Sequence, residues 1–112
     1  MALLEDLNTL LAKSDTQQQM KTPVAAEFMT LMSLALRDED DGIRSTGSLV
    51  AEALREKARG WLAQEDIVIL LEGQRDIARI RANNAQIALR NRIQSIVIRM
   101  IDLALISLLG IL

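Results

Sequence analysis

The sequence predicts an all-α protein in which short N-terminal helices precede one long, coiled-coil-like C-terminal helix with an apolar end. Half of the 112 residues are apolar, but only Phe28 and Trp61 are aromatic, and there are five Gly and one Pro. This composition favours helices over sheets. Residues 74–112 contain no Pro, and no Gly before Gly110. That run predicts a helix of about 55 Å, which we expect to associate with copies of itself in a homo-oligomer.

The N-terminal half contains three segments that we expect to be short helices. In residues 2–13, Leu recurs at helical spacing between polar residues. Thr22-Pro23 combines a good N-cap with a proline at the first helical position, and it predicts a helix that continues to about residue 36. The third helix is expected at 49–59. The preceding Ser-Thr-Gly-Ser at 45–48 is typical of a flexible connector.

The run Ile-Val-Ile-Leu-Leu at 67–71 admits a buried strand or a helix. Helix is favoured because no other segment offers a second strand to pair with it. Gly60 either ends the third helix or is bridged by it, and Gly73 is expected to be a kink or the turn of a hairpin into the long helix. We therefore divide this single domain into an acidic N-terminal helical region, residues 1–60, and a long C-terminal helical region, residues 61–112.

The long helix fits a heptad frame, and we call its a and d positions the seam. A buried Asn in such a seam controls register and oligomer state. Two other interpretations remain open for the polar positions: layers that face the wet lumen of a ring of copies, or a mixed surface in a partly fortuitous frame. The residues expected in the seam are Ile77, Ile80, Asn84, Ile87, Asn91, Gln94, Ile98, Ile101, Leu105 and Leu108.

From residue 96 onward the sequence is apolar on all sides of the helix, which is typical of burial in a core or in lipid. The segment spans about 25 Å, at the lower limit for crossing a bilayer. Arg99 and Asp102 interrupt it near its polar end. The residues expected to be buried in a membrane or in an assembly are Leu103, Leu105, Ile106, Leu108, Leu109, Ile111 and Leu112.

Charge is distributed unevenly along the chain. Residues 1–56 hold ten acidic and five basic residues, giving −5, and residues 57–112 hold eight basic and five acidic residues, giving +3. We expect ion pairs between subunits, although a solvated acidic face explains the first block equally well. Nucleic acid is disfavoured because the whole chain is acidic and its Arg-rich helix lacks aromatics. The residues expected in intersubunit ion pairs are Arg75, Arg79, Arg81, Arg90, Arg92, Asp38, Glu39, Asp40 and Asp41.

The residue types present restrict the chemistry. The chain has no Cys, His or Tyr, which excludes thiol nucleophiles, imidazole bases, disulfides and the usual zinc ligands. The acidic run 38–41 lacks the alternating spacing of a calcium loop, and Ser45, Ser48, Ser95 and Ser107 have no identifiable base partner. We expect a protein that is not an enzyme and holds no cofactor or metal.

The sequence therefore predicts a self-assembling helical structural subunit. Its expected partners are copies of itself, other subunits of a larger assembly and, if the tail enters a bilayer, membrane lipid. The layout fits a small phage virion protein of the ejection, tube or pore kind, located in the virion or at a membrane. Two alternatives remain. One is a soluble helical adaptor whose apolar C-terminal helix docks on a different protein, and the other is a small holin-like or pore-forming membrane protein.

Overall fold

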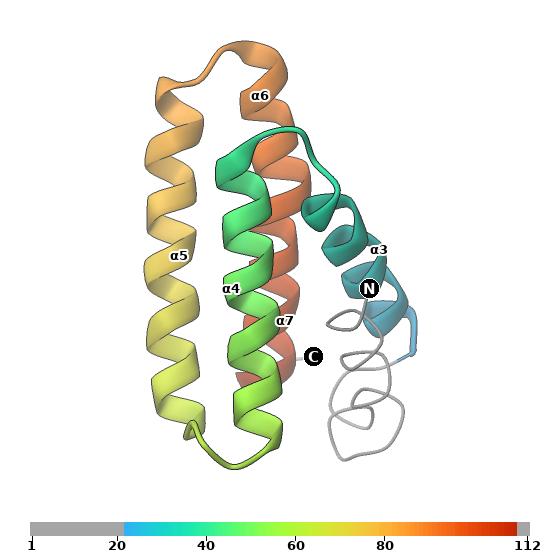
Figure 1. Ribbon diagram of the computed structural model, residues 1–112, viewed down its shortest axis with the longest axis vertical. Helices are drawn as coiled ribbons and strands as arrows, with labels where there is room; N and C mark the ends of the chain where they lie inside the picture. Colours follow the sequence, from blue (N-terminus) through green and yellow to red (C-terminus); the bar gives the residue numbers. More distant parts are fainter. Residues whose placement is uncertain (1–21, 110–112) are drawn as a thin grey trace.

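The computed structural model describes residues 22–109, and every regular element in that range is a helix (Figure 1). The elements are α3 (Thr22–Leu36), α4 (Asp41–Ala58), α5 (Gln64–Asn84), α6 (Ile87–Arg92), the π-helix η1 (Ile93–Ile98) and α7 (Arg99–Leu109). The last three are continuous, and we call residues 87–109 the C-terminal helix. The all-α prediction is confirmed for this range, and residues 67–71 are helical. The helix expected at 2–13, the side chain of Leu109, Ile111 and Leu112 lie outside the described residues.

The helices form an antiparallel bundle in which the chain direction reverses at each connection (Figure 1). α5 forms one edge, α4 and the C-terminal helix pack against it, and the shorter α3 lies inclined on the opposite side. Each helix contributes to one apolar core. The largest fully buried side chains are Phe28, Met32, Ile43, Val50, Ile67, Leu71, Ile93, Val97, Met100 and Ile101.

α4 begins earlier than expected, at Asp41, so the prediction of a flexible connector at residues 45–48 is wrong. The Asp40 carboxylate accepts a hydrogen bond from the backbone N–H of Ile43 at 2.9 Å and caps the helix. Gly47 lies buried within the helix, where an added Cβ would come 3.0 Å from the Ala35 Cβ. This glycine therefore permits the close approach of α3 and α4 and does not mark a loop.

The connection from α4 to α5 is a Schellman motif, as the alternative of a helix end at Gly60 predicts. Gly60 has a positive φ of 82°, its N–H donates to the Lys57 carbonyl at 3.0 Å, and the Trp61 N–H donates to the Glu56 carbonyl at 2.9 Å. α5 then continues through Gly73 to Asn84. Of the two alternatives predicted for Gly73, the hairpin turn is therefore wrong.

The prediction of a single long C-terminal helix is also wrong. The chain reverses at Ala85 and Gln86, both with an extended ψ of 158°. The Arg90 guanidinium donates from Nε to the Ala82 carbonyl at 3.0 Å and from Nη2 to the Ala85 carbonyl at 3.3 Å, satisfying carbonyls at the end of α5. Asn83 and Asn84 are weak helix formers, so the break costs little. Reversal allows the apolar tail to pack against α5 of its own chain, which stabilises both helices.

Candidate functional site: an exposed apolar face on α5

The apolar tail is covered by the chain's own bundle as far as Leu108, the last residue whose side chain is described. Leu103, Leu105 and Leu108 are buried, and Ile106 is half-buried. A single chain therefore already covers these side chains, and their burial in a membrane or in an assembly stays a prediction. Within residues 22–109, none of the helices combines the length and the apolar character that a membrane crossing requires.

Most of the charges expected to join subunits instead form ion pairs within one chain. Arg81 Nη2 lies 3.1 Å from Asp40 Oδ2, and Arg92 Nε lies 3.1 Å from Asp38 Oδ2. The same guanidinium approaches Glu39 Oε1 at 3.9 Å. These pairs join the loop between α3 and α4 to the ends of α5 and α6. We call these ion pairs within one chain the clasp, and intersubunit pairing by the same groups stays a prediction.

The remaining charges from that set have other roles. Arg75 Nε lies 2.8 Å from Asp102 Oδ1, Asp41 pairs with Arg44 on its own helix, and Arg90 is bound to carbonyls. Arg79 alone among the predicted Arg residues has neither an ion pair nor a hydrogen bond to the described part of the chain. Arg79 is therefore the one member of the predicted set that is left for a partner.

The pKa values of the clasp carboxylates reflect these contacts. Burial alone would raise the pKa of Asp38, whose side chain is only 7% exposed. The Asp40 N–H and the Arg92 guanidinium outweigh burial and lower the pKa of Asp38 below its usual value. For Asp40, burial is likewise outweighed by the Ile43 N–H and Arg81, so that pKa is also lowered. Both carboxylates are therefore held in their charged form.

One ion pair was not found from the sequence. Arg99 donates from Nε to Glu27 Oε2 at 2.8 Å and from Nη2 to Oε1 at 3.1 Å, a two-pronged contact that joins the C-terminal helix to α3. The hydrogen bond from Arg99 lowers the pKa of Glu27. The 72-residue separation hides this pair from any pattern of local spacing. The contact connects the two helices, and both carboxylate oxygens of Glu27 are engaged in it.

The predicted seam divides into a buried part and an exposed part, so a single continuous seam is wrong. Ile101, Leu105 and Leu108 lie in the bundle's own core, and Ile98 is half-buried. The reversal at residues 85–86 turns the remainder onto other surfaces. The exposed seam residues are Ile77, Ile80, Asn84, Ile87, Asn91 and Gln94.

α5 carries a row of isoleucines on the side opposite its core contacts. Ile69 is 69% exposed, Ile77 50% and Ile80 62%, whereas Ile67 and Leu71 are completely buried. Helical spacing places residues 69, 73, 76, 77, 80 and 84 on one side, which we call the α5 face. The sequence prediction missed Ile69 because residues 67–71 were treated as one buried run. Alternation of exposed and buried positions at a period of 3.6 residues is the signal that finds it.

A shallow groove of about 340 Å³ extends the α5 face toward the C-terminal helix. Its lining residues are Arg79, Ala82, Asn83, Gln94 and Ile98. Helical spacing places Ile87, which is 72% exposed, and Asn91 on the side of the C-terminal helix that bears Gln94. η1 forms the wall at Gln94 and Ile98, and a π-helical turn widens a helix locally. Arg79, Ala82 and Asn83 belong to α5, so the groove borders the helix that carries the α5 face.

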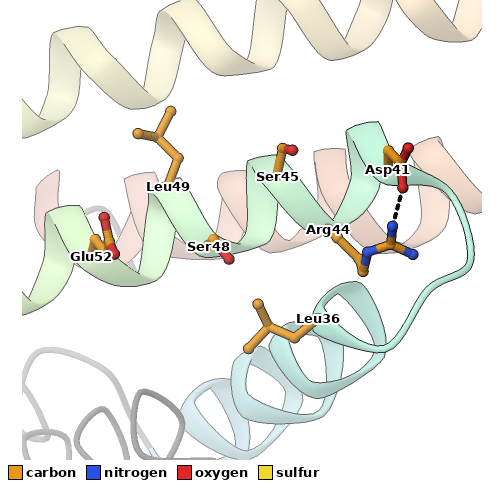
Figure 2. Close-up of a pocket in the computed structure, with 7 residues that line it drawn as sticks. All are labelled: Leu36, Asp41, Arg44, Ser45, Ser48, Leu49 and Glu52. Atoms are coloured by element: carbon orange, nitrogen blue, oxygen red, sulfur yellow. Dashed lines mark hydrogen bonds and ion pairs between the residues drawn. The ribbon is translucent and has the colours of Figure 1, made fainter.

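A second groove, of about 770 Å³, lies beside α4 and the end of α3 (Figure 2). Asp41 and Arg44 are already paired with each other, and Ser45 and Leu49 point away from Leu36, so the side chains do not converge on one point (Figure 2). No cluster of three acidic side chains suitable for a metal occurs in the described range. The residues that line this groove are Leu36, Asp41, Arg44, Ser45, Ser48, Leu49 and Glu52.

Comparison of the chain with protein-family models, with curated proteins and with solved structures gives no match. The functional argument therefore depends on the chemistry of the surface itself, and the α5 face is its most distinctive part.

Proposed function

We propose that this protein is a structural subunit without catalytic activity, which associates with a second copy of itself through the α5 face. The observation that supports the proposal is the row formed by Ile69, Ile77 and Ile80. Each is at least half exposed, although twenty apolar side chains are buried elsewhere in the described range. Exposed apolar side chains that gather on one side of an otherwise polar helix favour an interaction site there.

The expected strength of association follows from the area available. Covering an isoleucine that is half to two-thirds exposed contributes on the order of 1–2 kcal/mol. A pair of copies covers six such side chains from Ile69, Ile77 and Ile80, and this gain opposes a cost of about 4–15 kcal/mol in lost freedom of motion. The two are of similar size, so we expect a weak, concentration-dependent dimer.

The adaptor alternative now depends on the same surface. The apolar tail cannot be the docking element, because Leu103, Leu105 and Leu108 are buried in the bundle. The observation that favours a different partner is the groove at Arg79, Asn83 and Gln94, whose polar groups would bind a helix with complementary polar residues. The virion, tube and pore proposals depended on a continuous long helix. They stay predictions without support from this fold.

Charged substitutions on the α5 face test the proposal. Ile80→Asp would bury a carboxylate in the interface, and we expect dimerisation to weaken at least tenfold while the fold is retained, because the side chain is exposed in one copy. Ile69→Asp is expected to act in the same way. Sedimentation velocity measures the association, and circular dichroism verifies the helix content.

Leu34→Asp is the matched control, because Leu34 is 43% exposed. It belongs to α3, a helix that lies on the side of the bundle away from α5 (Figure 1). We expect it to leave association unchanged. If Leu34→Asp and Ile80→Asp weaken association equally, the effect is not specific to the α5 face. If the unmodified protein is monomeric up to millimolar concentration, the self-association proposal is wrong.

A further inference from the structure

Gly73 has no explanation within one copy of the chain. It lies in the interior of α5, where glycine is about 1 kcal/mol less favourable than alanine. Its φ is not positive, and an added Cβ would meet no atom within 4 Å. Neither the backbone nor the packing of the bundle therefore requires a glycine. A residue without a side chain on an exposed helix face is explained if another helix approaches closely there.

The four central positions of the α5 face are arranged symmetrically about its middle. In heptad terms residues 69, 73, 76 and 80 are successive core positions, centred between 74 and 75. Ile69 and Ile80 lie equally far from that centre, as do Gly73 and Asp76. When two such helices run antiparallel, Ile69 faces Ile80 of the partner subunit and Gly73 faces Asp76 of the partner subunit. The face is therefore complementary to itself, which an isologous two-fold interface requires.

The flanking positions favour the same direction. Glu72 and Arg79 occupy equivalent positions on one edge of the face, seven residues apart, and neither is paired within the described chain. Antiparallel helices bring Glu72 opposite Arg79 of the partner subunit, whereas parallel helices bring Glu72 opposite Ile77 of the partner subunit and form no such ion pair. On the other edge, the antiparallel arrangement places Leu70 opposite Ile77 of the partner subunit. Charge complementarity and apolar contact thus select one orientation.

We propose that two copies of this chain associate through an antiparallel pair of α5 helices that cross at Gly73, with Glu72 of each copy paired to Arg79 of the other. This inference rests on the proposed function and adds the identity, direction and register of the partner helix. Asp76, the charged member of the central layer, faces Gly73 of the partner subunit, whose missing side chain leaves the carboxylate accessible to water.

Site-specific disulfides test the direction, since the chain contains no cysteine of its own. Proteins with Ile69→Cys and Ile80→Cys are mixed, oxidised and separated without reductant. In the antiparallel pair, positions 69 and 80 are neighbours, while two copies of position 69 are about 16 Å apart. A disulfide requires Cα atoms within about 7 Å. We therefore expect the mixed disulfide as the main product. Disulfides of Ile69→Cys with itself, formed in preference, overturn the antiparallel arrangement.

Charge exchange provides a second measurement that does not depend on cross-linking. Glu72→Arg and Arg79→Glu each place like charges opposite one another, and we expect about three- to tenfold weaker dimerisation for each. The double variant restores opposite charges and should dimerise as the unmodified protein does. A dimer that is unaffected by either single change overturns the inferred register but leaves the proposed function standing. A protein that remains monomeric at all concentrations overturns both.

Discussion

At the scale of single residues, the three glycines Gly47, Gly60 and Gly73 show how one residue type serves different ends. Gly47 permits α3 and α4 to approach closely, and Gly60 adopts a positive φ of 82° that ends α4. Gly73 does neither. Sequence alone cannot separate these roles, because all three occur between helix-forming residues. The differences appear only when the neighbours of each Cα are known.

The free energy of unfolding should distinguish Gly73 from Gly60. Gly73→Ala adds a side chain that meets nothing within 4 Å, so it should raise the free energy of unfolding by about 1 kcal/mol. Gly60→Ala should lower it by about 1–2 kcal/mol, because alanine is strained at a positive φ. Urea titration at low protein concentration, where association is negligible, measures both. An equal loss of stability in the two variants would contradict the assignment of Gly73.

The clasp carboxylates predict a pH dependence. The folded-state pKa values of Asp38 and Asp40 lie below their unfolded values, near the usual value of about 3.9. Their contribution is therefore fully present above the unfolded pKa and is lost as pH falls through the folded pKa. We expect a constant urea midpoint between about pH 7 and pH 5 and a decline below about pH 4.

Asp40→Asn removes the negative charge but retains a side chain that can cap α4, because Asn is also a good N-cap. The variant should be less stable at pH 7 by about 0.5–1 kcal/mol, since its partner Arg81 is partly exposed to solvent. Its stability should also vary less with pH below about 4 than that of the unmodified protein. An identical acid transition in both proteins would show that Asp40 is not part of the clasp.

At the scale of helices, local signals predicted some boundaries and failed at others. The start at Thr22-Pro23 was predicted because a cap residue followed by proline is a local sequence signal. The stop at Gly60, one of two alternatives there, has a local signal too, because glycine readily adopts a positive φ. The reversal at residues 85–86 contains neither Gly nor Pro. It is stabilised by Arg90, which follows the two carbonyls it contacts by eight and five residues, and by the packing of the tail on α5. Tertiary contacts thus overrode continuous helix propensity.

Arg90 gives this reversal a direct test. Arg90→Gln removes the guanidinium that donates to the carbonyls of Ala82 and Ala85. We expect a loss of about 1–3 kcal/mol, because these carbonyls would lose a charged donor. Thermal unfolding at low protein concentration, where association is negligible, measures it, with Arg79→Gln as the control, since Arg79 has no contact of this kind within the described chain. Equal stability of the two variants would indicate that the turn does not depend on Arg90.

At the scale of the whole molecule, the sequence predicted the helical class but not which apolar surfaces would be left uncovered. The described part of the tail, the most apolar segment, is buried within the chain's own bundle. The exposed surface lies instead on α5, where Ile69 and Ile80 alternate with buried Ile67 and Leu71. A pattern shows that a residue is apolar; the three-dimensional arrangement decides whether its own chain covers it. Self-association stays a prediction, and our proposal bases it on α5 in place of the C-terminal helix.

Sedimentation velocity of the full-length protein without detergent, from low micromolar to millimolar concentration, tests self-association most directly. We predict a weight-average mass that rises with concentration from that of one chain toward that of two, and an Ile80→Asp protein that stays near the mass of one chain over the same range. A single-chain mass at every concentration for the unmodified protein would contradict the proposal that the α5 face joins two copies.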